Sequence, residues 1–432
     1  MQEITIQNLG PIDECTITCS STMIFTGAQA SGKSTIAKAI YFGHAIKDEL
    51  YNLILSISSE PIVETVADNF SRNFRADFEQ RLRQIFFKLF GPIWTIRKNA
   101  MLRFIFQNQY AITLEMVGMK RLEVLLSSPF ACTVENMVRT VTAPDLDKEH
   151  RKQTIVHALG RLFSESRTPI FIPAARSLMT SLGNQFGYLY ATMGDKLRDG
   201  FDYGTQAFIE KALEIMPEFS SGIGGLEATT SAILSRDKTY EIRYNTLKQL
   251  AETILKGSYR QTAGEDRLYI DDKHYVRLNY ASSGQQEAVW IINLIAYHLI
   301  KNKQVVYIIE EPETHLYPEA QQQIAKLIAL ARNVGNDVLV TTHSPYVLGA
   351  FNNLLYADKL SEQNILDKEL SCTIPANLRL DGKNTQAFFV EKGGIANAIE
   401  QETGLIDNEL IDGASHDINR EYDRLANLEG AF

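Results

Sequence analysis

Residues 27–34 have the residue types and the spacing of a loop that binds phosphate groups. They read GAQASGKS and fit the pattern G-x-x-x-x-G-K-[ST]. The apolar stretch 23–25 precedes them, and apolar residues at helical spacing follow over 35–45. We therefore expect a loop between a strand and a helix, where backbone N–H groups and the helix dipole attract a polyphosphate.

Each residue type in this loop has an expected role. Gly27 and Gly32 allow the backbone to approach the phosphates closely. Lys33 is expected to reach the β- and γ-phosphates of ATP, and Ser34 to bind Mg²⁺ through its hydroxyl. A glycine turn that binds nothing is the alternative. The expected nucleotide-binding residues of the loop are Gly27, Ala28, Gln29, Ala30, Ser31, Gly32, Lys33, Ser34 and Thr35.

A pair of carboxylates follows a second apolar run. Residues 304–309, QVVYII, are typical of a buried parallel strand and lead into Glu310 and Glu311. The carboxyl end of such a strand lies beside a phosphate loop. We assign Glu310 to the Mg²⁺ shell and Glu311, as a catalytic residue, to polarising the attacking water. An acidic loop that caps the next helix is the alternative.

Two further segments fit the same site. The apolar run 338–342 leads into His343, which we expect to contact the γ-phosphate as a third catalytic group beside Lys33 and Glu311, although a histidine before Ser-Pro is also common in turns. The segment 282–286, SSGQQ, opens an apolar helix over 288–300, so it is either an anion site or only a helix cap. Its expected nucleotide-binding residues are Ser282, Ser283, Gly284 and Gln285.

Together these segments resemble the motif set of the ABC-type ATPase heads of the RecF, SMC and OLD group. The set comprises Walker A at 27–34, a signature at 282–286, a Walker B strand ending in EEPETHLYP, and a switch segment, VTTHSP, that contains His343. The likeness is greatest to the OLD-like and Septu PtuA-like ATPases of bacterial phage defence. The opening EITIQNLGPI and the stretch FIPAAR at 171–176 also resemble segments of these proteins.

The resemblance implies a homodimer or higher oligomer in which two heads enclose ATP. Ser282 and Gly284 of one copy would then contact the γ-phosphate bound by the other copy. The chain departs from the pattern at Glu310, where transporters carry Asp, and at Tyr317, where many relatives carry His. Gln107 and Gln109 are candidates for the Q-loop glutamine, or are ordinary strand or turn residues.

Composition sets the broad class. The chain has 432 residues, 45% apolar and 22% charged, and a net charge of −9, as expected for an ordinary soluble protein of two or three compact units. The apolar stretch near 288–300 is too short for a membrane span and contains Asn293 and His298. No secretory signal begins the sequence, and the four cysteines lack zinc or disulfide spacing, so we expect a cytoplasmic protein with reduced thiols.

The motifs predict an α/β fold of the P-loop NTPase, ABC-ATPase type with a split head. We expect the two halves of the head at 1–56 and 257–360, an inserted lobe with helices and some strands at 57–256, and a closing segment with an acidic tail at 361–432. The stretches FACTV and MVRTVTA are strand signals within the lobe. Within 267–280, two short strands should deliver the chain to the signature.

Charge is distributed unevenly. Residues 71–103 carry eight bases and two acids with interleaved aromatic rings, which would suit contact with nucleic acid. The helical spacing of Phe74, Phe78, Leu82, Ile85 and Leu89 favours instead the two faces of an amphipathic helix. The tail after 401 is acidic and has apolar residues at helical spacing, for docking either on its own head or on a partner.

The leading hypothesis is an ATPase that dimerises around ATP with Mg²⁺ and works in anti-phage defence. It would either gate a partner effector, which is a nuclease or a toxin, or act on nucleic acid. Too few residues follow His343 for a Toprim nuclease domain, so we expect no nuclease activity in this chain. The alternatives are an ATP-bound scaffold that sequesters a toxin or nuclease without hydrolysis, a DNA-repair ATPase like RecF or SMC, and the engine of a membrane transporter, which the motifs fit poorly.

Overall fold

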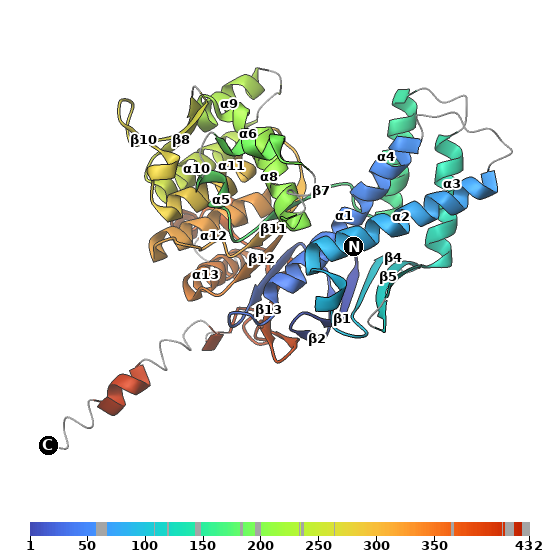
Figure 1. Ribbon diagram of the computed structural model, residues 1–432. Coiled ribbons are helices and arrows are strands. Elements are labelled where there is room, and N and C mark those ends of the chain that lie inside the picture. The colour runs from blue at the N-terminus through green and yellow to red at the C-terminus, as the bar shows by residue number, and fades with distance from the viewer. Residues whose placement is uncertain are drawn as a thin grey trace.

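The computed structural model describes residues 1–57, 67–107, 109–118, 121–142, 148–181, 185–194, 200–232, 234, 237–262, 264–363, 367–407, 409–410 and 419–425. Its centre is a six-stranded sheet in the order β14-β13-β3-β12-β11-β7 (Figure 1). Its strands are β3 (Thr22–Thr26), β7 (Thr168–Ile172), β11 (Val305–Glu310), β12 (Asp337–Thr342), β13 (Thr385–Glu391) and β14 (Gly394–Asn397). Only β14 pairs antiparallel, so β3, β11 and β12 end at the same edge.

The apolar runs of these strands are continuous because both faces of the sheet are covered. Along β11, Tyr307 and Ile309 lie in one hydrophobic core, and Val306 and Ile308 lie in the other. Side chains of a strand alternate between faces, so an uninterrupted apolar run indicates a layer on each side. The α/β fold class expected from the sequence is confirmed.

One face is covered by helices of the second half of the chain. Their buried residues form a single core with that face of the sheet. They are α8 (Tyr203–Ile215), α9 (Gly222–Ser231), α10 (Lys238–Leu255), α11 (Ser283–Ile300), α12 (Pro318–Asn333) and α13 (Pro345–Glu362). Beside them lies an antiparallel sheet of β8 (Ser258–Thr262), β9 (Glu265–Tyr269) and β10 (Tyr275–Arg277), which includes the predicted strand pair before the signature.

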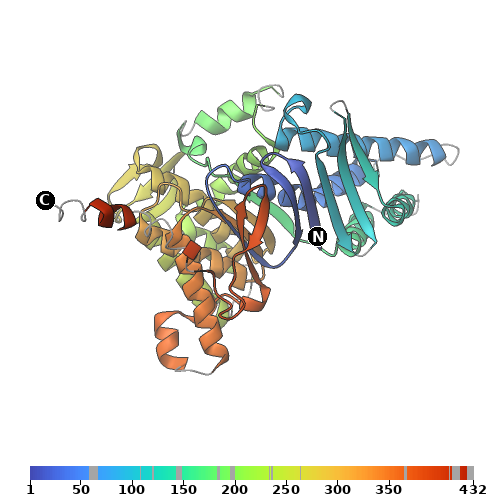
Figure 2. The same ribbon diagram turned by 90° about the horizontal axis from the view of Figure 1, so that it is seen from below.

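The other face packs against α1 (Lys33–Ile57), which follows the phosphate loop. Behind it stands a second sheet in the order β2-β1-β4-β5-β6, whose blue and teal strands lie side by side in Figure 2. Its strands are β1 (Glu3–Leu9), β2 (Ile12–Thr18), β4 (Met101–Gln107), β5 (Tyr110–Val117) and β6 (Arg121–Leu126). The helices of this side are α2 (Ala67–Phe90), α3 (Ser128–Val141) and α4 (Lys148–Phe163). Helix α1 is therefore held between two sheets.

Short elements complete the described chain. The α-helices among them are α5 (Leu178–Ser181), α6 (Gln185–Thr192) and α14 (Asp367–Thr373). The 3-10 helices are η2 (Ile93–Thr95), η3 (Met216–Phe219), η4 (Leu278–Tyr280), η5 (Ala376–Leu378) and η6 (Gly382–Asn384).

The range 57–256, expected as an inserted lobe, contributes to both sheets. Strands β4 to β6 extend the β1–β2 hairpin, and β7 forms one edge of the central sheet. The sequence predicts strands at the stretches FACTV and MVRTV. Both lie instead in the helix α3. That helix buries Phe130, Val134, Met137, Val138 and Val141, so the helical repeat of its apolar residues outweighs the β propensity of its valines and threonines.

The basic and aromatic segment forms mostly α2. Phe74, Phe78, Leu82, Ile85 and Leu89 are all buried, so the amphipathic-helix interpretation is confirmed. Several bases face carboxylates: Arg75 and Arg83 pair with Glu79, and Arg81 lies 3.7 Å from Glu49. Trp94 is exposed beyond the helix.

The acidic tail begins against the head, where Ile406 is buried, but its described helix 419–425 stands away from the rest of the molecule in Figure 1. Its helical part, 419–425, is exposed throughout, including Tyr422 and Leu425, so these residues do not pack on the head. Ile418 and Leu428, which belong to the same apolar repeat, lie outside the described residues. Over the part of the chain that the structure covers, every helix is too short or too polar to cross a membrane.

A buried histidine makes stability depend on pH. Burial lowers the pKa of His298 to about 4, and its Nδ1 lies 2.8 Å from the Leu294 carbonyl and 3.0 Å from the Tyr307 hydroxyl. Below pH 6.5 the unfolded chain binds a proton at this residue that the folded chain does not. The free energy of unfolding should therefore fall by about 1.5 kcal/mol between pH 6.5 and pH 5 because of His298.

Urea unfolding at the two pH values measures this effect. His298→Leu should lose about 1.5 kcal/mol less than the wild-type chain over the same interval. Equal losses in the two proteins would contradict the prediction, whatever the stability of the variant at pH 6.5.

Candidate functional site

The phosphate loop leaves β3 at Thr26 and enters α1 at Lys33, as predicted from its sequence. Gly27 and Gly32 have φ values of +142° and +115°. A Cβ on Gly27 would lie 2.5 Å from the Val390 carbonyl oxygen, and one on Gly32 would lie 2.5 Å from Ile12 Cδ1. Neither position can hold a side chain without movement of the chain, so both glycines are needed for the shape of the loop.

A cavity of about 250 Å³ opens at this loop. It is lined by Pro11, Ala30, Ser31, Gly32, Lys33, Ser34, Thr35, Ala174, Glu310, Glu311 and Thr341. The cavity therefore brings together the loop and both acids of the β11 end, which are nearly 280 residues apart in the sequence. Gly27, Ala28 and Gln29 belong to the loop but do not line the cavity.

Lys33 is directed at its own loop. Its Nζ donates to the carbonyl oxygens of Gly27 and Ala28, both at 2.8 Å. Burial lowers the pKa of Lys33, and the charges of Glu311 and Glu313 oppose that shift. An ammonium group held by two neutral carbonyls would gain stronger partners in phosphate oxygens.

The two predicted Mg²⁺ ligands are in contact. The Ser34 hydroxyl donates to Glu310 Oε1, and burial raises the pKa of the Glu310 carboxyl. One hydroxyl and one carboxylate beside a phosphate cavity fit Mg²⁺, which prefers oxygen ligands and takes the rest of its shell from phosphates and water. Bound there, the ion would neutralise negative charge on the phosphate oxygens.

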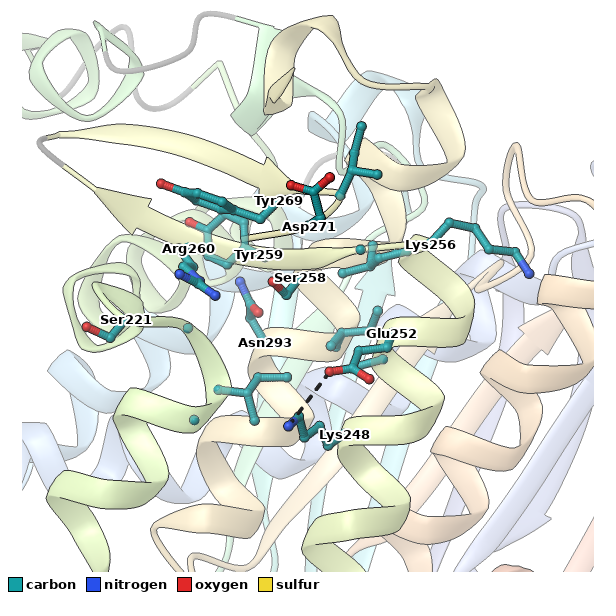
Figure 3. Close-up of a pocket in the computed structure, with 18 of the residues that line it drawn as sticks. Ser221, Lys248, Glu252, Lys256, Ser258, Tyr259, Arg260, Tyr269, Asp271 and Asn293 are labelled. Carbon is teal, nitrogen blue, oxygen red and sulfur yellow. Dashed lines mark ion pairs between the residues drawn. The ribbon is translucent and has the colours of Figure 1, made fainter. Parts of the chain in front are cut away.

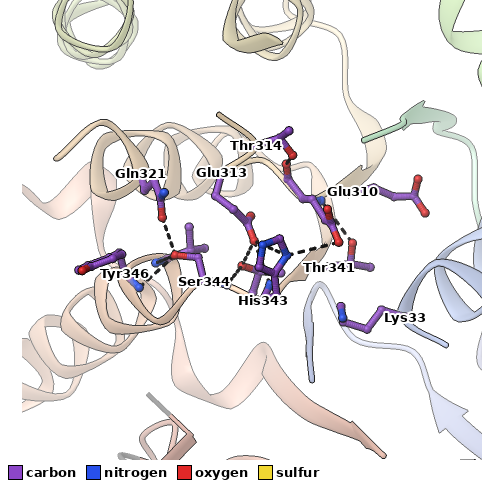
Figure 4. A network of polar contacts seen from close by, with 12 residues as sticks. Lys33, Glu310, Glu313, Thr314, Gln321, Thr341, His343, Ser344 and Tyr346 are labelled. Carbon is purple, nitrogen blue, oxygen red and sulfur yellow. Dashed lines mark hydrogen bonds and ion pairs between the residues drawn. The ribbon is translucent and has the colours of Figure 1, made fainter. Parts of the chain in front are cut away.

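Glu311 occupies a constrained backbone position directly after β11. Its φ is +42°, and its N–H donates to the Thr341 carbonyl at 2.9 Å, which ties the turn to the neighbouring strand β12. Non-glycine residues adopt this region at a cost, and such strain concentrates at functional sites. The Glu311 carboxylate is partly exposed and lies 3.4 Å from Nδ1 of His343 (Figure 4).

Glu313 holds His343 in place. Its buried Oε1 accepts hydrogen bonds from the Thr342 hydroxyl at 2.6 Å and the His343 N–H at 2.9 Å, and lies 3.5 Å from His343 Nδ1. Nδ1 of His343 thus lies within 3.5 Å of both the Glu311 and the Glu313 carboxylates. Figure 4 shows the Glu313 side chain directed at the His343 ring. Sequence reasoning quoted Glu313 only as part of EEPE and assigned it no role.

Arg176 is a second residue without a predicted role. It follows β7, is 0% exposed, and donates from Nη1 to the Glu310 carbonyl at 2.8 Å and from Nη2 to the Glu311 carbonyl at 3.1 Å. Its Nε lies 3.2 Å from the buried carboxylate of Glu287, on α11. Arg176 thus connects the β11 end to the helix that the signature begins.

The signature residues lie at the start of α11. Ser282 is the N-cap of α11 and forms a capping box with Gln285, a role that leaves the exposed face of the segment open for the predicted anion contact. Ser282 and Ser283 are exposed, and Gly284 is buried, with room for no Cβ because His315 O would lie 2.6 Å away. No signature residue lines the phosphate-loop cavity.

The two candidates for a Q-loop glutamine lie elsewhere. Gln107 ends β4, and its side-chain amide donates to the Arg161 carbonyl and to the Ser164 hydroxyl. The Gln109 carbonyl accepts a hydrogen bond from the Ser127 hydroxyl at 2.9 Å. Neither residue lines the phosphate-loop cavity. This placement favours the strand and turn interpretation of both.

A known protein family matches a range of the chain that includes much of this site. Residues 150–348 match the AAA ATPase domain family. The matched range contains Arg176, the signature, Glu310, Glu311 and His343, whereas the phosphate loop precedes it. The match supports the presence of an AAA ATPase domain in this range. No curated protein matches the chain.

Three solved structures of Smc heads are distantly similar. The Smc head bound to the C-winged helix domain of ScpA is 12% identical, with a TM-score of 0.40 over 92% of this chain and 96% of that one. The Smc head with an extended coiled coil bound to the ScpA C-terminal domain, from Pyrococcus furiosus, is 11% identical, with a TM-score of 0.41 and coverages of 97% and 99%. The SMC head of Thermotoga maritima is 11% identical, with a TM-score of 0.35 and coverages of 81% and 91%.

Proposed function

We propose that this chain binds ATP with Mg²⁺ at the phosphate loop and hydrolyses it to ADP and phosphate. The observation that carries the proposal is the convergence of Lys33, the Ser34–Glu310 pair and Glu311 at one cavity from two segments of the chain that are nearly 280 residues apart. The ATPase family match over 150–348 supports it independently, because that range excludes the phosphate loop.

Each residue at the cavity would have a separate role in hydrolysis. Lys33 would bind the β- and γ-phosphates, and Ser34 and Glu310 would hold the ion. Glu311 would accept a hydrogen bond, and then the proton, from a water whose oxygen attacks the γ-phosphorus while the bond to the β-phosphate oxygen breaks. His343, fixed by Glu313, would orient Glu311 or contact the γ-phosphate.

We propose further that two copies enclose the nucleotide. The support is that the signature serines are exposed and do not reach the cavity of their own chain. Exposed tyrosines stand beside three of the motifs: Tyr280 before the signature, Tyr317 after the β11 turn and Tyr346 after His343, with 74%, 78% and 50% of their surface exposed. Exposed aromatic side chains are typical of protein contact surfaces.

We propose that this cycle controls a protein effector, a nuclease or toxin, or acts on nucleic acid. The resemblance to OLD-like and Septu PtuA-like ATPases supports phage defence as the setting. The exposed Tyr422 and Leu425 of the acidic tail offer a site for such a partner, because they do not pack on the head.

Lys33→Ala tests the nucleotide site. We expect the affinity for ATP to fall about 10- to 100-fold, since hydrogen bonds to charged groups contribute about 1.5–3 kcal/mol. Fluorescence titration with a labelled ATP analogue measures the change. Lys301→Ala is the matched control, because Lys301 follows α11, lies 3.2 Å from Glu218 and is outside the cavity. Equal affinities in the two variants would contradict the proposal.

A further inference from the structure

We propose a second ligand site, in the cavity between α9, α10, β8, β9 and α11, for a planar nitrogen heterocycle that carries an anionic group, as a nucleoside monophosphate does. The cavity holds about 470 Å³, within the usual range for small-molecule sites. It shares no lining residue with the phosphate-loop cavity. Figure 3 shows it between the α10 and α11 helices and the β8–β9 hairpin.

Asn293 is the residue that points to a ligand. It lies on α11 within the run Ala288–Tyr297, where it is the one residue with a side-chain amide or charge, is 1% exposed, and lines the cavity. Its side chain extends from α11 toward Ser258 and Arg260 in Figure 3. Across the described parts of the chain, no group forms a hydrogen bond with Asn293 Oδ1. A buried amide oxygen without a partner is costly, so a ligand donor in the cavity would explain its presence.

The other polar residue in the apolar part of this helix shows the contrast. His298 is also buried, but its ring nitrogen has the Leu294 carbonyl and the Tyr307 hydroxyl within hydrogen-bond distance. Its polarity is thus satisfied inside the fold. The Oδ1 atom of Asn293 lacks such a partner in the described chain, although Asn293 lies only five positions earlier on the same helix.

The rest of the lining defines the ligand class. An amide offers a donor and an acceptor side by side, which is the arrangement that pairs with the edge of a nucleobase. Apolar side chains of Ile223, Leu255 and Ile292 form walls suited to a ring. These features favour a flat heterocycle at the Asn293 end of the cavity.

Charge places the anionic group near Arg260. Its guanidinium lies 4.5 Å from the centre of the Tyr269 ring, and no carboxylate of the described chain pairs with it. Two of the three lining acids have other partners: Glu252 lies 4.0 Å from Lys248, and Asp271 accepts the N–H groups of Lys273 and His274. The third, Asp272, is exposed. Lys256 also lines the cavity, but its side chain extends away from Asn293 in Figure 3, so Arg260 is the cation placed beside the Asn293 end for a phosphate.

The wall of the cavity also touches the signature. The Leu255 carbonyl accepts a hydrogen bond from Gln285 Nε2 at 2.7 Å, and Gln285 forms the capping box with Ser282. A ligand beside Leu255 would thus contact a residue that is hydrogen-bonded to Gln285 of the signature.

Calorimetric titration of the full-length chain with AMP, GMP, CMP and UMP, each in turn, tests the site. We expect at least one to bind and Asn293→Leu to weaken that binding at least tenfold. Arg260→Ala should weaken the monophosphate but not its parent nucleoside. Asn353→Leu, the same change at an exposed position on α13, should leave binding unchanged.

The variants should fold, since Leu in place of an unpartnered buried amide is expected to keep or raise the melting temperature. Asn293→Ala serves as a second variant if Asn293→Leu does not fold. Absence of binding by all four nucleotides would overturn the proposal. So would binding that survives Asn293→Leu and disappears in Lys33→Ala, because the nucleotide would then occupy the phosphate loop. These measurements do not depend on ATP turnover.

Discussion

Replacing Glu311 with glutamine should lower the rate of ATP hydrolysis by about 10²- to 10⁴-fold, the range found when a general base is removed. Nucleotide binding should persist, because Lys33, Ser34 and Glu310 are unchanged and the Glu311 main chain keeps its bond to Thr341. Steady-state phosphate release and a separate binding titration measure the two effects. The amide cannot accept the proton of the attacking water, which is the physical reason for the loss.

Glu319→Gln is the matched control, since Glu319 lies exposed in the first turn of α12. Its turnover should match that of the wild-type chain. If Glu311→Gln also kept wild-type turnover, Glu311 would not be the base. If neither the wild-type chain nor any variant released phosphate although ATP bound, the non-hydrolysing scaffold would be the better hypothesis.

The second large effect concerns Arg176. Arg176→Met leaves Glu287 buried without its cationic partner, so the free energy of unfolding should fall by about 3–5 kcal/mol. Chemical denaturation measures this loss. Arg121→Met is the control: Arg121 pairs with Glu123 on the surface, and its loss should cost less than about 1 kcal/mol.

A double variant separates stability from function. Arg176→Met with Glu287→Leu removes both buried charges, so much of the lost stability should return. ATP turnover should remain low, because the carbonyls of Glu310 and Glu311 still lack the donor that fixes their turn. Recovery of stability and turnover together would show that Arg176 has no role beyond folding.

The sequence predicted the parts of the site that depend on local pattern. Gly27 and Gly32 are required by a loop shape that nearby residues determine, and the apolar runs before Glu310 and His343 mark buried parallel strands. Since parallel strands end at one edge of a sheet, their following residues could be placed together without a structure.

Other parts depend on contacts between distant segments, which have no local pattern. The ion pair of Arg176 and Glu287 joins residues that are 111 positions apart. In the sequence, neither residue differs from an ordinary charged surface residue. The position of Arg176 shortly after the apolar strand 168–172 could have indicated that it lies near the site. The sequence alone identifies it only as part of the segment FIPAAR. The pairing of β4 with β1 could not be inferred either, because strand partners are chosen by tertiary packing.

The most direct test of the nucleotide site is a crystal structure of the chain with Mg²⁺ and a non-hydrolysable ATP analogue. We expect the phosphates on the loop from Gly27 to Thr35, Lys33 turned from the loop carbonyls to the phosphate oxygens, the ion held by Ser34 and Glu310, and Glu311 beside the γ-phosphate. An analogue bound away from this loop, or phosphates on the loop with Glu311 directed away from them, would contradict the proposed function.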